Sequence, residues 1–544
     1  MRGVNNGRFA RGVCEAAVLG FIVAGALVLR LWGVRRGLPY LQEWDEPLVL
    51  TWVIGMIQRG DLDPHTYAYT NAYYYMLLPV MYLCYIYLHA HKLIMSPWDI
   101  QLFHPQAAYA RYWWYISYPE FYLWGRVLTA FFGAATVFLI YRIGKVAFGS
   151  ATGLLAAAVL AVAPGTIYYA DTVRVDIPMM FFLMLAVLVG LRILERGLPR
   201  DYARAGLLAG LAVSTKPNAF FVILPLLIAH LLNPDRIHVF DRQLKRMGLF
   251  AVAGFALGTP LALIQPLAFF VRMSQNAPAY GFPSLSGMHA GLPLYLGYLI
   301  HPSQGQEWYV IPHVGIGLIP TAAAVLGLVA GFLWKPKVQL YLISFPIVYF
   351  IYTSGVHFLP LRYIVPVFPF VALLAAIGSV WVWRLLGAHW PLKGTIFIRV
   401  LAAAGIILLL FGPTRDSIKL AESMQADRDT RGLAVEWLEH HVPSGSRVAF
   451  EAELRWFLPD LNRLPFTALY PSRNEGLGWY LDHHIDFAAV GEQSPLRTSQ
   501  VVARIPSPSY LPSSSQVATW SPDTFSVVDP SLLIIKLPTI QSAR

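Results

Sequence analysis

Long apolar segments separated by short polar connections dominate the first 410 or so residues of the chain. Each resembles a helix that crosses the hydrocarbon core of a bilayer, although several are short. The pattern predicts a mainly α-helical, polytopic membrane protein with about eleven spans, near residues 15 to 33, 121 to 141, 150 to 168, 177 to 194, 204 to 215, 218 to 232, 248 to 264, 314 to 334, 338 to 353, 363 to 384 and 397 to 412. The first segment also fits a secretory signal peptide, but its length and the lack of a small-x-small cleavage site favour an uncleaved span.

Basic residues gather in alternate connections between these segments. Because cytoplasmic loops carry an excess of Lys and Arg, this pattern places the N-terminus in the cytoplasm of a plasma-membrane protein. A crossing at the aromatic segment 70 to 91 would invert every later basic connection. Residues 34 to 120 are therefore expected to form one long extracytoplasmic loop, with helices 44 to 58 and 71 to 91 in or on the membrane interface. Arg272 and residues 280 to 291 are expected in a second long outer loop that closes over a site.

The composition changes after residue 412, which divides the chain into a membrane domain (1–412) and a C-terminal domain (413–544). The second part is rich in Pro and Ser and has no apolar run of spanning length. Within it, "DTRGLAVEWLEHHVPSG" predicts an amphipathic helix, and "RVAFE", "IDFAAVG", "FSVV" and "LLIIKL" predict strands. We expect a soluble extracytoplasmic α/β domain in which residues 506 to 522 form a loop.

The overall composition excludes an ordinary soluble protein, because 56% of the 544 residues are hydrophobic and only 13% are charged. The net charge of +11 follows from the basic connections, and no nucleic-acid signal is present. Cys14 and Cys84 have no metal-ligand spacing and are expected to be packing residues. His289, His301, His313 and His357, with Glu307, raise the alternative of a metal site, but their spacing favours solvated loop residues. We predict no cofactor and no metal ligands.

Isolated charges mark the predicted outer ends of the spans. Charges at membrane depth cost several kcal/mol unless they are paired or solvated in a cavity, so their placement indicates a site. Transfer of a sugar from a lipid phosphate to a hydroxyl needs a carboxylate base and cations that hold the phosphate. Burial of such a carboxylate among apolar side chains at the edge of a cavity is expected to raise its pKa. The charges are Glu43, Asp45 and Glu46 in the first loop, then Asp171, Arg174, Asp176, Lys216, Arg272, Glu307 and Arg362.

Four of these sites carry a family resemblance: "WDE" (44–46), "RVDIP" (174–178), "STKPN" (214–218) and "RYIVPVFP" (362–369). In order and spacing they resemble the GT-C integral-membrane glycosyltransferases, nearest to the bacterial group similar to protein O-mannosyltransferases and the lipid A aminoarabinose transferase. The resemblance covers about the first 410 residues and continues less specifically into "DTRGLAVEWLEHHVPSGSRV". It implies a polyprenyl-phosphate sugar donor, an extracytoplasmic active site and inversion at the anomeric carbon. The expected partners are the membrane, the lipid-linked sugar and an acceptor protein, lipid or glycan of the cell envelope.

The same resemblance assigns roles to six residues. Asp45 matches the acidic residue expected to act as base, Glu46 its neighbour that positions donor or acceptor, and Asp176 the second-loop acid. Arg174, Lys216 and Arg362 match the family's basic positions, and we expect them to hold the donor phosphate. The chain departs from the family in having "YTNAYYYMLLP" where many members have His-Pro-Pro, and in lacking a β-trefoil module. The acceptor-facing surface is therefore expected to be unusual.

Each of these residues also has a purely structural interpretation. Asp45 and Glu46 fit a solvated helix N-terminus, and Asp176 fits a helix N-cap before Ile-Pro. Arg174 could pair with Asp171 or Asp176, and Arg362 could anchor a span end at the interface. Two other functions remain open: a lipid-linked sugar transporter or flippase, and a non-catalytic partner in envelope assembly. A transporter predicts charges near the middle of spans, whereas these charges gather at outer ends.

Overall fold

The computed structural model describes most of the chain. The described residues are 2–38, 45–66, 70–100, 102–103, 115–235, 238–280, 283–300, 315–356, 359–389, 395–423, 430–451, 465–469, 471, 475–491, 494–498, 500–505 and 532–537. Glu43, Glu307, His301, His313 and His357, together with the predicted strand "FSVV" and the 506–522 loop, lie outside these ranges.

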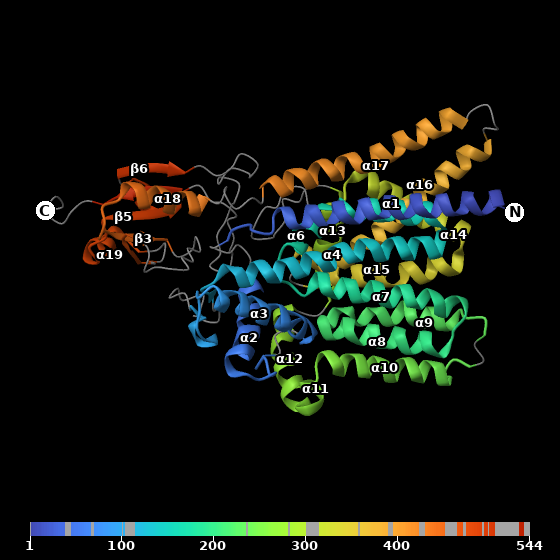
Figure 1. Cartoon of the computed structure of the whole chain (residues 1–544), viewed down its shortest axis with the longest axis horizontal. Helices are drawn as coiled ribbons and strands as arrows, with labels where there is room; N and C mark the ends of the chain where they lie inside the picture. The colour runs from blue at the N-terminus through green and yellow to red at the C-terminus, as the bar shows by residue number, and fades with distance from the viewer. Residues whose placement is uncertain are drawn as a thin grey trace.

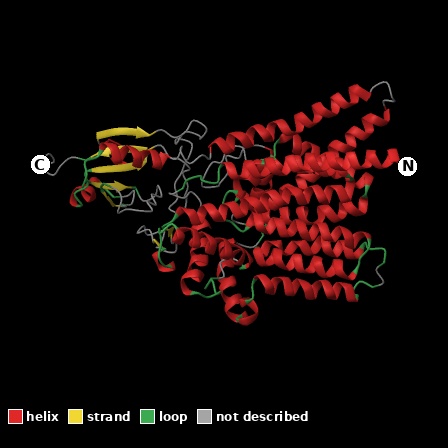
Figure 2. Cartoon of the chain, in the orientation of Figure 1, coloured by secondary structure: helices red, strands yellow, loops and turns green. Residues whose placement is uncertain are grey.

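A bundle of helices forms the larger part of the molecule, and a small sheet lies beyond one end of it (Figures 1 and 2). Every predicted span corresponds to a helix or to a pair of consecutive helices. These are α1 (Arg2–Trp32), α4 (Pro119–Phe148), α5 (Ser150–Ala161) with α6 (Pro164–Ala170), α7 (Asp176–Glu195), α8 (Pro199–Thr215), η3 (Pro217–Val222) with α9 (Ile223–Leu231), α10 (Arg242–Gly258) with α11 (Leu261–Ile264), α14 (Leu318–Trp334), α15 (Pro336–Gly355), η4 (Leu361–Val367) with α16 (Phe368–His389), and α17 (Thr395–Ser423).

Within the described ranges, fewer helices than the eleven predicted spans are both long enough and apolar enough to cross a membrane. Among the described residues, six helices are long and apolar enough to cross a membrane, or seven if the bent pair α5–α6 is one span. Pro217–Leu231 and Leu318–Trp334 are shorter apolar helices. The chain is a multi-pass membrane protein, but the predicted count of eleven is not confirmed.

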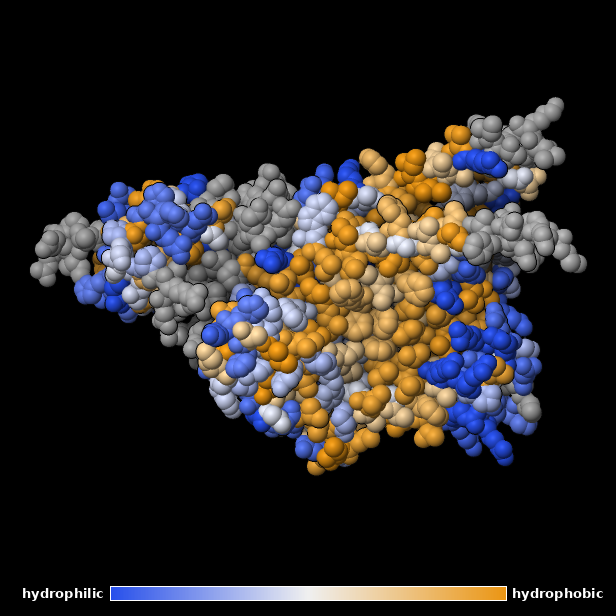
Figure 3. Space-filling view, in the orientation of Figure 1, coloured by the Kyte–Doolittle hydropathy of each residue, from blue (hydrophilic) through white to orange (hydrophobic). Residues whose placement is uncertain are grey.

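The two ends of the bundle differ in polarity. Hydrophobic side chains cover its flank, and hydrophilic side chains gather near the α7–α8 and α9–α10 connections (Figure 3). This is the end at which the N-terminus lies, whereas α2 (Asp45–Arg59) and α3 (Ala72–Ala90) lie at the other end, nearer the sheet (Figure 1). The basic connections therefore share one end, as the alternation of charges along the sequence requires.

The segment expected as the first outer loop contains the two predicted helices, α2 and α3, followed by η1 (Pro97–Asp99) and a short antiparallel pair, β1 (Leu102–Phe103) and β2 (Tyr115–Ile116). A separate apolar core joins this segment to the bundle, with Ile54 and Leu77 packed beside Phe121 of α4 and Val173 before α7. This core fixes the first turn of α2 against the end of the bundle.

The segment expected as a second long outer loop is largely helical in the described residues. Arg272 lies in α12 (Pro266–Tyr280), and much of 280 to 291 belongs to α13 (Leu285–Ile300). Gly, Ser, His and Pro interrupt the apolar residues of α13 and hide it in a hydropathy profile. Burial of Tyr295 and Tyr298 stabilises this helix, and the Tyr295 hydroxyl donates to the Pro360 carbonyl at 3.2 Å.

A break between α5 and α6 bends the chain by 61°. A bend of this size frees backbone carbonyls, here among the buried residues Leu160 and Ala161. The buried Arg30 of α1 satisfies them, because its guanidinium donates to the carbonyls of Leu160 (3.3 Å) and Ala161 (3.2 Å) and to the Thr166 hydroxyl (3.0 Å). Arg30 is therefore a structural charge that supports the bend.

The C-terminal part is a five-stranded mixed sheet in the order β4-β3-β5-β7-β6. Strand β3 pairs in parallel with β4 and β5, and β7 runs antiparallel to β5 and β6. The sheet has an apolar core on each face, one of which includes side chains of α18 and the other those of α19. Its elements are α18 (Thr430–His441), β3 (Arg447–Phe450), β4 (Thr467–Leu469), α19 (Leu477–Asp482), β5 (Phe487–Gly491), η8 (Pro495–Thr498), β6 (Gln500–Ile505) and β7 (Leu532–Lys536). The sequence predicted α18, β3, β5 and β7 but not β4 or β6.

The contact between α8 and α10 supplies a test of the bundle. A Cβ atom added at Gly210 would lie 2.0 Å from the Ala251 carbonyl oxygen, whereas one added at Gly248 would meet nothing within 4 Å. Gly210→Ala is expected to force the helices apart and lower the stability by about 1 to 3 kcal/mol. Gly248→Ala is the control and should be neutral or slightly stabilising. Thermal unfolding in detergent measures both, and equal midpoints would contradict the close packing.

Candidate active site

Asp45 lies between two arginines contributed by other segments. It is the first residue of α2, and its Oδ2 lies 3.5 Å from Nη2 of Arg174 and 3.6 Å from Nη1 of Arg362. Arg174 precedes α7 by two residues, and Arg362 lies in η4. The Asp45 side chain keeps 15% of its surface exposed, whereas that of Arg174 keeps 2%. A carboxylate that remains reachable thus faces two guanidinium groups, as the sequence predicted for these three residues.

A second ion pair joins Lys216 and Asp176. The ammonium of Lys216, at the end of α8, donates to Asp176 Oδ1 at 2.6 Å, and both side chains are almost fully buried. The ammonium also lies 4.8 Å from the centre of the Tyr363 ring, next to Arg362 in the chain. The N-cap interpretation of Asp176 was wrong, because Val175 is the N-cap residue of α7 and no side chain caps this helix.

The charges around Asp45 determine its protonation. Burial acts to raise the pKa of Asp45, but the positive charges of Arg362, Arg174 and Lys216 outweigh it and hold the pKa below its usual range. The expectation of a raised pKa was therefore wrong, because it considered burial without the cations. Asp45 is ionised at neutral pH, and its carboxylate protonates only as the pH falls below the ordinary range for aspartate.

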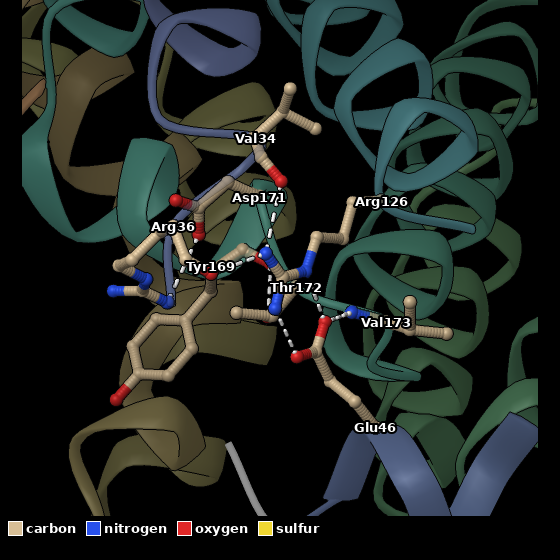
Figure 4. A network of polar contacts seen from close by, with 8 residues as sticks. All are labelled: Val34, Arg36, Glu46, Arg126, Tyr169, Asp171, Thr172 and Val173. Carbon is tan, nitrogen blue, oxygen red and sulfur yellow. Dashed lines mark hydrogen bonds and ion pairs between the residues drawn. The ribbon is translucent and has the colours of Figure 1, made fainter. Parts of the chain in front are cut away.

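Glu46 belongs to a different and more deeply buried network, although it follows Asp45 directly (Figure 4). Arg126 of α4 donates hydrogen bonds to both carboxylate oxygens of Glu46, from Nε to Oε1 at 2.7 Å and from Nη2 to Oε2 at 2.6 Å. The Val173 amide donates to the same carboxylate at 2.9 Å. Arg126 Nη1 also donates to the carbonyls of Val34 (2.9 Å) and Arg36 (2.7 Å). Glu46 has no exposed surface, and both of its carboxylate oxygens accept hydrogen bonds from the protein.

A further pair lies beside this network. Arg36 Nη2 is 3.3 Å from Asp171 Oδ1, and the Arg36 guanidinium lies 4.1 Å from the centre of the Tyr168 ring. The Thr172 hydroxyl donates to the Tyr169 carbonyl at 3.0 Å, which folds the chain back before Val173 (Figure 4). Asp171 thus has Arg36 as a partner, while Arg174 reaches Asp45.

Sequence reasoning missed Arg126 and Arg36. Arg126 stands within the apolar segment "FYLWGRVLTAFF", and a lone charge inside a predicted span was the available signal, since such a group requires a partner. Of the remaining candidates, His289 is an exposed residue of α13, and the side chain of Arg272 lies outside the described part of the structure. Across the described ranges, no group of three or more His, Cys, Asp or Glu residues could hold a metal ion.

Comparisons with known proteins agree with this architecture. Residues 122–260 match the family model described as dolichyl-phosphate-mannose-protein mannosyltransferase, and this segment includes Arg174, Asp176 and Lys216. YycA of Bacillus subtilis (strain 168), a mannosyltransferase by name, is 28% identical over 166 residues, which are 30% of this chain and 23% of YycA. The chain thus matches about a quarter of the length of this relative.

Two crystal structures of ArnT from Cupriavidus metallidurans resemble the whole chain. The apo form has a TM-score of 0.53 at 14% identity and covers 90% of this chain and 96% of that chain. The form bound to undecaprenyl phosphate has a TM-score of 0.52 at 14% identity, with coverage of 96% and 98%. The molecule is an integral-membrane protein with the GT-C glycosyltransferase fold. Within that class it is similar to the mannosyltransferases related to protein O-mannosyltransferases, as its sequence motifs indicated.

Proposed function

We propose that the protein transfers a sugar from a polyprenyl phosphate to a hydroxyl group of an extracytoplasmic acceptor. The observation that carries this proposal is the position of Asp45 between Arg174 and Arg362, with Lys216 as a third cation acting on it. A base next to a cluster of cations is what transfer from a lipid phosphate requires. The GT-C fold and the match to mannosyltransferases support the same class of reaction.

In the proposed reaction the acceptor hydroxyl attacks the anomeric carbon from the face opposite the phosphate. Asp45 accepts the hydroxyl proton as the new carbon–oxygen bond forms. The bond from the anomeric carbon to the phosphate oxygen breaks, and the polyprenyl phosphate leaves with the bonding electrons. A single displacement of this kind inverts the anomeric centre. Arg174, Arg362 and Lys216 stabilise the negative charge that grows on the leaving phosphate.

The same cations would couple donor binding to the strength of the base. In the structure they hold the pKa of Asp45 low, which makes it a weak proton acceptor. A donor phosphate drawn to Arg174 and Arg362 adds negative charge beside Asp45 and raises its pKa toward the working range of a base. Asp45 would then be a stronger base when a donor is bound. Asp176 has a supporting role, because it holds the Lys216 ammonium in place.

The proposed orientation follows from the two ends of the bundle. The end with the basic connections would face the cytoplasm, and the end with Asp45 would face outward with the C-terminal sheet. The acceptor would be a protein, lipid or glycan of the cell envelope. The proposed donor carries a polyprenyl phosphate, the chemical class to which the undecaprenyl phosphate in the ArnT crystal structure belongs.

Binding of undecaprenyl phosphate to the purified protein tests the proposed donor site. Arg362→Met is expected to weaken binding about 10-fold to 100-fold, since a hydrogen bond to a charged group contributes about 1.5 to 3 kcal/mol. Arg384→Met is the control, because Arg384 lies near the end of α16 and stacks on Trp334 at 3.7 Å, away from Asp45 in α2. Native mass spectrometry measures both variants. A wild-type protein that neither binds undecaprenyl phosphate nor transfers sugar from labelled polyprenyl-phosphate donors would contradict the proposed function.

A further inference from the structure

Two pairs of neighbouring residues face each other across the site. Asp45 and Glu46 are consecutive in α2, and Val173 and Arg174 are consecutive before α7. Glu46 accepts the Val173 amide hydrogen at 2.9 Å, while Asp45 lies 3.5 Å from the Arg174 guanidinium. The first contact is buried, and the second lies at the reachable side of α2. The position of Glu46 therefore sets the position of Asp45 relative to Arg174.

Arg126 extends this connection to two more segments. Its guanidinium binds the Glu46 carboxylate through two nitrogens and donates through the third to the carbonyls of Val34 and Arg36. One side chain of α4 thereby holds the connection after α1 and the start of α2, and through Glu46 it also holds the loop before α7 (Figure 4). We call Glu46 and Arg126 the clamp.

The energetics of the clamp favour a role in geometry. Taking two charges out of water costs several kcal/mol per ion, and a well-packed apolar pair of similar volume is often equally stable or more so. The side chains of Arg126 and Glu46 are 1% and 0% exposed, so they carry that cost in full. A planar guanidinium that binds a carboxylate through two bonds restricts both distance and angle, which an apolar contact does not.

We propose that Glu46 and Arg126 are positioning residues, which fix the distance between the Asp45 carboxylate and Arg174 and hence between the base and the donor phosphate. This inference rests on the proposed function and changes the expected role of Glu46. Both Glu46 oxygens accept hydrogen bonds from the protein, so Glu46 acts through Asp45 and Val173 without touching a reactant. A displacement of 1 Å at a reacting group can reduce a rate about 10²-fold.

Two variants of the clamp test the proposal. Glu46→Gln removes the charge, and Arg126→Lys keeps the charge but loses the two parallel bonds. Both are expected to lower kcat, by about 10²-fold for Glu46→Gln and less for Arg126→Lys, with little change in the KM for the donor. The double variant should lose no more than Glu46→Gln, because the two residues act as one unit.

The titration of the Asp45 carboxyl group gives a second readout that does not depend on enzyme turnover. Infrared spectroscopy measures it, and the band that is lost in Asp45→Asn is assigned to Asp45. Arg174, Arg362 and Lys216 are the charged groups that face this carboxylate. Withdrawal of Arg174 removes positive charge from beside Asp45, so the pKa of Asp45 should rise in Arg126→Lys, which leaves the net charge of the clamp unchanged. Arg30→Lys is the matched control, since Arg30 is an equally buried arginine that binds backbone carbonyls at the α5–α6 bend. It should lower stability without shifting this titration.

The outcomes are distinct. A wild-type protein without transfer activity would remove the proposed function, while a raised pKa of Asp45 in Arg126→Lys would still support the clamp. Unchanged kcat and unchanged Asp45 titration in folded Arg126→Lys would overturn the clamp and leave the proposed function intact. Failure of both variants to fold, with Arg30→Lys folded, would identify the pair as a stability element and would also overturn the proposal.

Discussion

Asp45→Asn should reduce sugar transfer by about 10²-fold to 10⁴-fold, the usual contribution of a general base. The amide has nearly the shape of the carboxylate but does not accept a proton from the acceptor hydroxyl. The rate is measured per folded protein with a labelled polyprenyl-phosphate sugar. Folding is checked by the thermal midpoint, because the ion pairs of Asp45 with Arg174 and Arg362 are lost as well.

Donor binding gives this variant a second readout. Replacement of the carboxylate leaves Arg174 and Arg362 without the negative charge that they share in the wild-type protein. Undecaprenyl phosphate should therefore bind Asp45→Asn at least as tightly as the wild type. Loss of transfer with retained binding separates a base from a binding residue. Full activity in the folded variant would exclude Asp45 as the base.

Lys216→Met is the second change with a large expected effect. It leaves the carboxylate of Asp176 buried without its ammonium partner, and breaking a buried ion pair in this way costs about 3 to 5 kcal/mol. It also removes one cation from the site. We expect a marked fall in the thermal midpoint and a loss of transfer in the protein that remains folded.

The double variant Lys216→Met/Asp176→Leu separates these two effects. Replacement of both partners by apolar groups removes the unpaired charge, so most of the stability should return. Transfer should stay low, because the cation is still missing. Recovery of both stability and activity in the double variant would show that Lys216 has only a structural role.

The site residues could be predicted from the sequence because charged residues are rare near the predicted spans. Asp45, Arg174, Asp176, Lys216 and Arg362 were identified because isolated charges at predicted span ends need partners, and the structure forms ion pairs among these five residues. The span number was harder to predict, since segments such as Pro217–Leu231 are apolar but too short to cross alone. Helix α13 was missed because Ser, Gly, His and Pro interrupt its apolar residues, although Tyr295 and Tyr298 are buried in the structure.

The partner of each charge was beyond the reach of sequence reasoning. Asp45 and Glu46 are adjacent and chemically alike, yet one faces Arg174 and Arg362 at a reachable edge and the other is enclosed by Arg126. The difference arises from the helical rotation between consecutive residues, which directs neighbouring side chains to different sides. The direction of the Asp45 pKa shift depends in turn on cations that only the fold brings near.

The long separation of the clamp residues along the chain has a consequence for biosynthesis. Glu46 and Arg126 are 80 residues apart, so the carboxylate emerges from the ribosome well before the Arg126 guanidinium on α4. A carboxylate is costly in the hydrocarbon core, which means that the start of α2 has to stay hydrated until α4 has been inserted. The end of the bundle that holds Asp45 and Glu46 is therefore expected to form late, once both α1 and α4 are in place.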